Sequence, residues 1–327
     1  FAPTKIEGED SIDEGLVITD GYGNEYVWVE VPKTNEVYPT AGLNVTAFTD
    51  EEYVKIENDL HTYTSDYRNG TEYKDVYYAD SADGWFKNEA EYNELKYKML
   101  KSIYQNCGFW IGRYEAGLEE GKNPRTSYVA ISASDKAVIK PNMYPYNYVT
   151  RDEAQTLAQK MDYGDCKGSL IFGIQWDLVL KYIETKNPAQ KSNLLTNSTS
   201  IGNYYNSKFT LNRGKFAQYN ALSKWYNFNS EEKPTLVTGS NKKEQSLYEN
   251  GILLTTGATD ATKLQNIYDI AGNVWEWTLE FYDTSAPCVS RGGNYVNLGS
   301  DNPAKDRYSD NTSYSLNIVG FRVGLWK

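Results

Sequence analysis

The chain has 327 residues and a formal net charge of −11, with 44 acidic side chains against 33 basic ones. That length can bury a core without disulfide bridges. The acidic charge excludes the basic surface that nucleic acid or anionic lipid requires, so we expect no nucleic-acid partner. No apolar run approaches the roughly 18 residues of a membrane helix, so we expect no membrane insertion in this chain.

Tyrosine dominates the aromatic residues, with 29 Tyr against 10 Phe and 8 Trp. Its side chain offers a large rigid contact surface with a polar tip and is therefore common in binding surfaces. The alternative is a β-rich fold with tyrosine on half-buried strands. Composition alone leaves both interpretations open.

The first half of the chain predicts a hairpin and then a helix. Residues 1–14 are expected to be an N-terminal extension, and residues 15–32 alternate with period two around a turn at 20–24, which predicts two strands. Residues 33–86 are polar and predict a loop with a short helix over 51–58. Apolar side chains at helical spacing then predict a helix over 89–106.

The middle of the chain predicts one strand, two helices and a long irregular region. Residues 109–115 are rich in β-formers, and Thr150 with Glu153 forms the capping box that begins a helix. A further helix is expected over 176–184. Residues 185–262 have few apolar runs and must be held by packing. The aromatic residues expected to hold this region are Tyr204, Tyr205, Phe209, Trp225 and Tyr226. We therefore predict an α+β fold in one domain, residues 15–327.

Three motifs follow one another in the C-terminal third of the chain: YDIAGNVWEW, RGG and GFR. Earlier segments agree with them in order: FWIGRYEAG, NYVTRDEA and SLIFGIQWDLVLKY. Together they resemble the formylglycine-generating, or sulfatase-modifying factor, family. The resemblance implies a C-type-lectin-like fold with a few helices, small antiparallel sheets and a large irregular fraction.

The residues of these motifs first suggest a scaffold. A strand through the WEW segment places Trp275 and Trp277 on one face and Glu276 on the other. The planar guanidinium groups of Arg291 and Arg322 can each hold carbonyls or carboxylates of loops. Core packing is therefore the expected role of all three motifs.

The resemblance also implies a calcium site before the WEW segment. Its ligands would be the carboxylates of Asp269 and Glu276 and the carbonyls of Gly272 and Val274, which are the hard oxygens that Ca²⁺ prefers. The alternative is that both carboxylates bond arginine side chains. No other cofactor is expected.

The family's oxidases bind copper with two cysteines, at the fourth and ninth positions after RGG. Those positions are Asn297 and Asn302 here, and amides are poor ligands for a soft metal. We therefore expect that the protein is not an enzyme. The rival hypothesis is an oxidase relative with altered chemistry.

Other redox or metal chemistry finds little support in the sequence. Cys107, Cys166 and Cys288 lie far apart without a C-x-x-C pair, so neither a disulfide framework nor a zinc site is predicted. The related non-haem iron branch needs histidines, and His61 alone does not supply a facial triad.

The segment that replaces the catalytic cysteines is rich in a few polar residue types. Over 294–317, Asn, Tyr, Ser, Asp and Thr make up 16 of 24 residues. Antibody paratopes have a similar composition, but so do solvated turns. Composition leaves these two interpretations nearly even.

The segment resembles the variable region of a non-catalytic branch of the same family, the variable proteins of diversity-generating retroelements. The resemblance implies a non-enzymatic, ligand-binding protein that displays the diversified segment 294–318, faces outward on a bacterial surface or phage tail, and binds an unknown protein or surface ligand. A fixed-specificity surface or tail protein is the alternative. The predicted ligand contacts are Asn294, Tyr295, Asn297, Leu298, Lys305, Asp306, Tyr308, Asp310, Asn311, Asn317 and Ile318.

Overall fold

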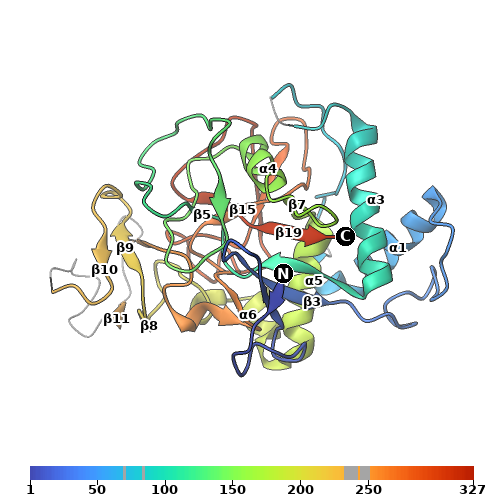
Figure 1. Cartoon of the computed structure of the whole chain (residues 1–327), viewed down its shortest axis with the longest axis horizontal. Coiled ribbons are helices and arrows are strands. Elements are labelled where there is room, and N and C mark those ends of the chain that lie inside the picture. Colours follow the sequence, from blue (N-terminus) through green and yellow to red (C-terminus); the bar gives the residue numbers. More distant parts are fainter. Residues whose placement is uncertain (69–70, 83–84, 232–241, 244–250) are drawn as a thin grey trace.

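The computed structural model describes residues 1–68, 71–82, 85–231, 242–243 and 251–327. Over these residues the chain combines six α-helices with several small, mostly antiparallel sheets (Figure 1). This confirms the expected α+β class. No helix in the described part of the chain is long and apolar enough to cross a membrane.

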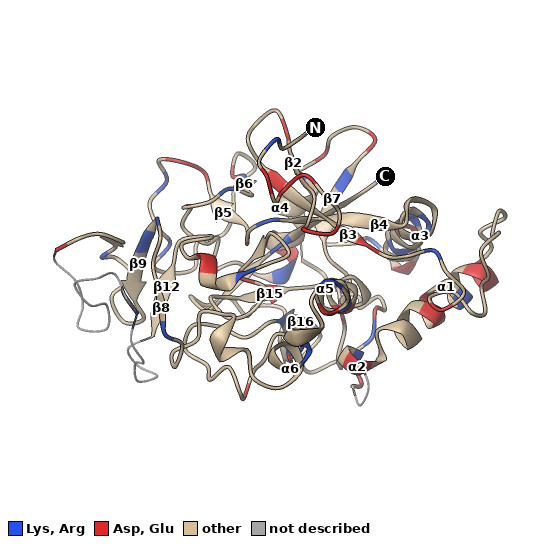
Figure 2. Ribbon diagram, turned by 90° about the horizontal axis from the view of Figure 1, so that it is seen from below, with Lys and Arg blue, Asp and Glu red and all other residues tan. Residues whose placement is uncertain are grey.

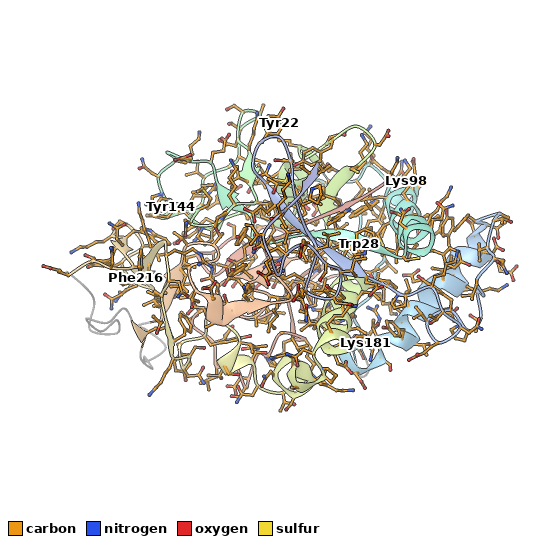
Figure 3. All side chains as sticks on the ribbon, turned by 60° about the horizontal axis from the view of Figure 1, so that its bottom comes forward. Tyr22, Trp28, Lys98, Tyr144, Lys181 and Phe216 are labelled. Atoms are coloured by element: carbon orange, nitrogen blue, oxygen red, sulfur yellow. The ribbon has the colours of Figure 1, made fainter. Side chains whose placement is uncertain are left out.

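The largest sheet has six strands and contains residues from both ends of the chain. The strands lie in the order β1 (Ala2–Pro3), β2 (Val17–Thr19), β3 (Glu25–Glu30), β4 (Gly108–Gly112), β19 (Val323–Trp326) and β7 (Lys167–Leu170). Both termini therefore lie on the same side of the molecule (Figure 2). The predicted hairpin is confirmed as β2 and β3, and the exposed Tyr22 stands at its turn (Figure 3).

The helices are α1 (Asp50–Tyr63), α2 (Ser65–Arg68), α3 (Glu89–Asn106), α4 (Arg151–Gln159), α5 (Gly173–Lys186) and α6 (Lys191–Leu195). The structure confirms α3 with its predicted bounds. The Asn88 side chain caps its first turn, and Cys107, at φ 62°, ends it. Helix α4 begins at the predicted Thr150–Glu153 capping box.

Two predicted helices are too short. Helix α1 covers Asp50–Tyr63, because Thr49 and Glu52 form a capping box at its start and buried Ile56 and Leu60 anchor its inner side. Helix α5 begins three residues before the predicted segment, where the side chain of Gln175 accepts from the backbone N–H of Phe172. In both helices packing extends the predicted periodic segment.

A second, four-stranded sheet carries the three C-terminal motifs. Its order is β17 (Arg307–Asp310), β16 (Cys288–Arg291), β15 (Trp275–Trp277) and β18 (Val319–Phe321). Strand β16 is antiparallel to both β15 and β17, whereas β18 runs parallel to β15. Strand β17, from the segment predicted to bind ligand, is therefore at one edge of this sheet.

The remaining elements are short. They are β5 (Gly117–Leu118), β6 (Ala137–Val138), η1 (Pro188–Gln190), η2 (Ser198–Ser200), β8 (Phe209–Thr210), β9 (Lys215–Gln218), β10 (Tyr226–Asn227), β11 (Lys242–Lys243), β12 (Ile252–Leu254), η4 (Asp260–Thr262), β13 (Lys263–Leu264) and β14 (Ile267–Tyr268).

The region predicted to be irregular is held by polar groups as well as by aromatic packing. Tyr204 and Phe209 are buried. The ammonium group of the buried Lys243 donates to the backbone carbonyls of Tyr204, Tyr205 and Ser207 at 2.7, 3.2 and 2.8 Å. Residues 232–241 and 244–250 of this region lie outside the described residues.

Candidate ligand-binding face

Strand β17 has one buried and one exposed face. Its register pairs Arg307 with Arg291 and Tyr308 with Ser290, and successive side chains of a strand point to opposite faces. The Arg307 side chain is 4% exposed, whereas Tyr308 is 43% exposed. One short strand thus combines an anchor with an accessible aromatic ring.

The buried face of β17 belongs to a network of charged side chains. We call its four most buried members, Asp177, Glu280, Arg291 and Arg307, the buried ion-pair network; Arg68 donates to Asp177 at its edge, at 3.4 Å. Arg291 donates to Asp177 at 2.6 Å and to Glu280 at 3.1 Å. Arg307 donates to the same two acids at 2.8 and 2.9 Å. Each acid therefore accepts hydrogen bonds from both arginines. The network joins α5, which carries Asp177, to β16 and β17.

The electrostatics of Glu280 reflect this pairing. Burial alone would raise its pKa, but the guanidinium groups of Arg307, Arg291 and Arg68 lower the pKa to about 2. Charged hydrogen bonds inside a protein are strong only when the partners are fully matched. The expected anchoring role of Arg291 is confirmed by these contacts.

The RGG motif also needs its second glycine. Gly293 has φ +78°, and a Cβ there would lie 2.5 Å from the carbonyl oxygen of Asn302. Only glycine adopts this backbone region without a steric penalty. The turn after β16 therefore brings the following segment against the sheet.

The third motif, GFR, links this four-stranded sheet to the six-stranded sheet. Arg322 donates to both carboxylate oxygens of Glu276, at 2.6 and 2.9 Å, and both side chains are buried. It also donates to the carbonyls of Gly112 and Tyr268, at 2.9 and 2.8 Å. The prediction that Arg322 holds loop carbonyls and a carboxylate is confirmed.

The predicted calcium ligands have other partners in this structure. Both oxygens of Glu276 accept from Arg322, while Asp269 accepts from the Thr262 hydroxyl at 2.7 Å and the Gly257 amide at 2.8 Å. These carboxylates therefore do not fit a calcium ion unless Arg322 moves away. For Glu276 the alternative interpretation, a bond to an arginine side chain, is confirmed. The calcium site stays a prediction.

One face of the sheet carries the buried side chains of Trp275 and Trp277, over which the half-buried Tyr314 and the exposed Tyr308 pack; we call these four rings the aromatic face. The Tyr308 ring stacks on Trp275 with a centroid distance of 5.8 Å and lies 6.3 Å from Tyr314. The indole N–H of Trp277 donates to the carbonyl of Val149. Both tryptophans lie on one face as predicted, and Tyr308 covers part of them.

The predicted contact residues do not all reach the surface. Asn294 and Tyr295 are buried, and the Tyr295 hydroxyl accepts from the side chain of Asn317 at 2.8 Å. Tyr308 and Asn311 are exposed. The half-buried ones are Asn297, Leu298, Lys305, Asp306, Asp310, Asn317 and Ile318. The predicted set thus extends from the core to the surface.

The two asparagines at the family's cysteine positions hold turns. The side chain of Asn297 accepts from the backbone N–H of Asn294 at 3.1 Å, and that of Asn302 donates to Asp306 at 3.3 Å. Cys288 is buried, and burial raises the pKa of its thiol to about 12. All three cysteines are unpaired with one another.

Two surface cavities border the predicted segment. A cavity of about 570 Å³ is lined by Lys305, Asp306 and Arg307 together with the stacked rings of Tyr73 and Tyr282. A larger one, of about 920 Å³, is lined by Thr312 and Ser313 and by residues from the loops before α3 and α4. We call the larger one the α4 cavity.

Sequence reasoning missed the part of these walls that comes from Tyr67, 71–73 and 80–82 and from Tyr128 and 130–133. Those residues lie far from the predicted segment in the chain and carry no motif. The tyrosines of the first stretch are the only signal that could have drawn attention to it. Strand β17 lies between the two cavities, since Arg307 lines one and the loop after the strand lines the other.

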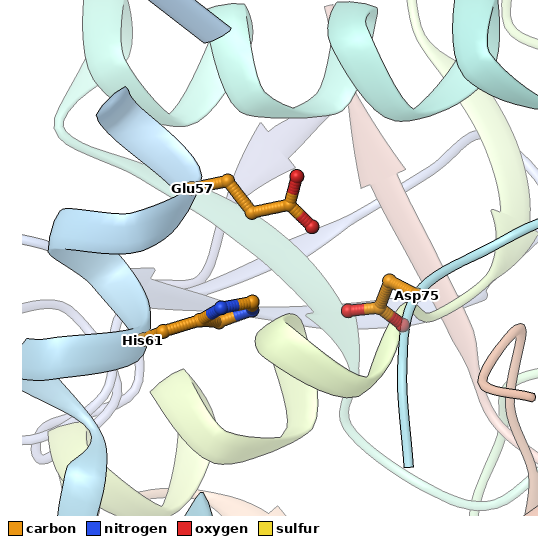
Figure 4. Close-up of side chains that lie close together, drawn as sticks. All are labelled: Glu57, His61 and Asp75. Atoms are coloured by element: carbon orange, nitrogen blue, oxygen red, sulfur yellow. The ribbon is translucent and has the colours of Figure 1, made fainter. Parts of the chain in front are cut away.

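His61 has two carboxylates beside it, which the sequence did not predict. Ligand atoms of Glu57, His61 and Asp75 lie within 4.8 Å of one another (Figure 4). Lys96 donates to both oxygens of Glu57, at 3.1 and 3.3 Å, and the backbone amides of Gly173 and Ile174 donate to Asp75. The carboxylate oxygens are therefore already engaged.

The surroundings of His61 also oppose a cation. Burial, followed by the positive charges of Arg68 and Lys96, lowers the pKa of His61 to about 3. The neighbouring positive charges of Arg68 and Lys96 also repel a divalent cation. A facial iron triad needs two histidines, and the chain has one.

Comparison with known proteins supports the family resemblance. The family model for the sulfatase-modifying factor enzyme 1-like domain matches residues 199–325. The resemblance stated from the motifs is thereby confirmed. No curated protein matches the sequence.

A solved structure, Treponema denticola variable protein 1, is similar to 67% of this chain and 85% of its own, with 13% sequence identity and a TM-score of 0.35. A likeness this distant says nothing about what this chain binds.

Proposed function

We propose that the protein is a non-enzymatic ligand-binding protein that presents a recognition surface on a C-type-lectin-like scaffold. The observation that carries the proposal is the alternation along β17. Arg307 anchors the strand in the buried ion-pair network, while Tyr308 is 43% exposed on the aromatic face. Side chains on the exposed face can therefore change without breaking the anchor.

The non-enzymatic part of the proposal is supported by the residues at the family's copper positions. Asn297 and Asn302 bond neighbouring groups of their own turns. The buried Cys288, with its raised thiol pKa, is unsuited to act as a thiolate. The described residues offer no second cysteine beside it.

The proposal also covers how the recognition surface arose. The polar composition of 294–317 and its place between RGG and GFR favour a variable protein of a diversity-generating retroelement, directed outward on a bacterial surface or phage tail. Its partner would be a protein or surface ligand, and Tyr308 would be the aromatic anchor, a residue type enriched among binding hot spots.

An assay for peptide oxidation tests the first part. The copper-loaded chain is incubated in air with a sulfatase-type peptide that contains the target cysteine, and the peptide is followed by mass spectrometry. We expect the peptide to stay unchanged. The Asn297→Cys/Asn302→Cys double variant is the matched control, since it restores both thiols. Copper-dependent oxidation by the unaltered chain would contradict the proposal.

The gene's neighbourhood tests the second part. We expect a reverse transcriptase gene and a near-identical template copy of the coding stretch for 291–322, differing at adenines alone. Absence of both would overturn diversification and leave a binder of fixed specificity.

A further inference from the structure

The α4 cavity has two buried carboxylates in its wall. Asp80 comes from the loop before α3, and Asp152 is the second residue of α4. Their side chains are 6% and 3% exposed. One oxygen of each, Oδ2 of Asp80 and Oδ1 of Asp152, has no hydrogen-bond partner among the described residues. These two oxygens face Nη2 and Nε of Arg151 at 3.8 Å, and both acids line the cavity of about 920 Å³.

One cation, Arg151, faces two carboxylates. Arg151 approaches Asp80 and Asp152 only to 3.8 Å, beyond hydrogen-bond distance. Its Nη1 instead donates to the carbonyl of Pro287 at 3.0 Å, and its guanidinium lies 4.0 Å from the ring centroid of Trp85. Its Nε and Nη2 face the two carboxylates and have no hydrogen-bond partner within the described chain, so one positive charge stands against two negative ones.

The other charged side chains around the cavity have hydrogen-bond partners of their own. Lys160 donates to the carbonyls of Ser132, Ala133 and Asp135. Glu153 accepts from the Tyr128 hydroxyl and from two backbone amides. The Cys288 thiol is near both acids, and the charge of Asp310 acts on the same thiol. None of these groups supplies a positive charge to the carboxylates.

A proton supplies the second positive charge. Burial raises the pKa of Asp152, Arg151 opposes this, and the charge and hydrogen bond of Asp80 bring the pKa to about 7. Near neutral pH the pair therefore holds close to one proton. A ligand with a fixed positive charge and N–H donors would release that proton and balance the second carboxylate charge.

We propose that the α4 cavity binds an alkylammonium group, the side chain of a lysine. The ammonium would donate to Asp80 and Asp152, and its methylene stem would lie along Ala130, Ile131 and Ala133 in the cavity wall. A divalent metal fits less well, because Arg151 already contributes one positive charge 3.8 Å from both carboxylates.

The site gives the recognition surface a preference for basic partners. The cavity includes Thr312 and Ser313 of the predicted segment, so a lysine bound there would lie beside the aromatic face. The net charge of −11 also attracts a basic protein, because the two charges are opposite in sign. This last step rests on the proposed function, whereas binding of a free lysine derivative does not.

The test is a calorimetric titration of the full chain with Nα-acetyl-lysine methylamide at pH 8. We expect saturable binding that is at least tenfold weaker for the neutral Nζ-acetylated analogue. Asp80→Asn/Asp152→Asn should abolish binding, and Asp162→Asn, which removes an exposed carboxylate outside the cavity, should leave it unchanged. Thermal melting establishes that each variant is folded.

A second measurement does not depend on any variant. In the unaltered chain, affinity for the lysine probe should rise at least fivefold from pH 5.5 to 8, as the pair loses its proton. Equal binding of the neutral analogue, a flat pH dependence, or preference for acetate over lysine would overturn the proposal. Failure of lysine binding would leave the recognition role of Tyr308 intact, because that role is tested by diversification and not by this probe.

Discussion

Arg307 and Tyr308 are neighbours in one strand, yet they lie in opposite environments. Arg307 donates to two buried acids, whereas Tyr308 is 43% exposed over Trp275. The difference shows how a segment of mainly polar residues can be fixed in place and still present variable side chains. The period of two in a strand separates the anchoring positions from the presenting ones.

The largest expected effect on stability comes from removing an anchoring side chain, Arg291. Arg291→Ala leaves Asp177 and Glu280 buried with one arginine fewer, which costs about 3–5 kcal/mol for an uncompensated buried charge. Chemical denaturation followed by tryptophan fluorescence measures the loss. Lys305→Ala, a nearby half-buried cation, is the control and should cost under about 0.5 kcal/mol. A loss below about 1 kcal/mol for Arg291→Ala would contradict the anchoring role.

The buried ion-pair network should also control stability in acid. The pKa of Glu280 falls from 4.5 to about 2 in the folded chain, so its contribution is complete above pH 4.5 and is lost as the pH falls toward 2. The loss is on the order of 3 kcal/mol. Unfolding free energies measured from pH 6 to 2.5 test this, and Glu280→Gln should flatten the curve over that window. If Glu280→Gln kept the same slope of unfolding free energy against pH, groups other than Glu280 would cause the sensitivity to acid.

The α4 cavity should respond to pH with the opposite sign. The pKa of Asp152 is raised from 3.8 to about 7, so the folded chain holds its proton longer and loses stability as the pH rises from 3.8 through 7. Asp152→Asn should therefore stabilise the protein by about 1–2 kcal/mol at pH 8 and by less at pH 5. Melting curves at the two pH values measure this. Equal effects at both would exclude the assigned titration.

The smallest effect should come from removing calcium. Since Arg322 occupies both oxygens of Glu276, EGTA should shift the melting temperature by less than about 1 °C, the scale of a few tenths of a kcal/mol. A drop of several degrees that added calcium reverses would instead support the predicted ion at Asp269 and Glu276.

Local signals in the sequence predicted the parts of the fold that are fixed locally. Helix α3 has its predicted bounds because apolar spacing and a cap coincide. The extent of α1 was missed, although the Thr49–Glu52 capping box was available in the sequence. Buried tyrosines occur on helices as well as strands, as with Tyr92 and Tyr26. The half-buried-strand explanation for the tyrosine excess is therefore incomplete.

The candidate site could be predicted only where its residues are close in sequence. The chosen contacts Asp306, Tyr308 and Asp310 follow the strand period and omit the anchor Arg307. Composition could not separate Tyr295 from Tyr308, because burial of Tyr295 depends on tertiary packing. The pairing of Asp80 with Asp152 was likewise invisible, since distant segments form the cavity.

The most direct test of the account compares two saturation libraries of the full chain under one stability selection, such as protease resistance on a display surface. One library varies the presenting positions Tyr308, Asp310, Asn311 and Ser313, and the other varies the anchoring positions Glu276, Arg291, Arg307 and Arg322. We predict that most variants of the first library stay within about 1 kcal/mol of the parent and that almost none of the second remain folded. Equal intolerance in both libraries would contradict the separation of anchor from recognition surface.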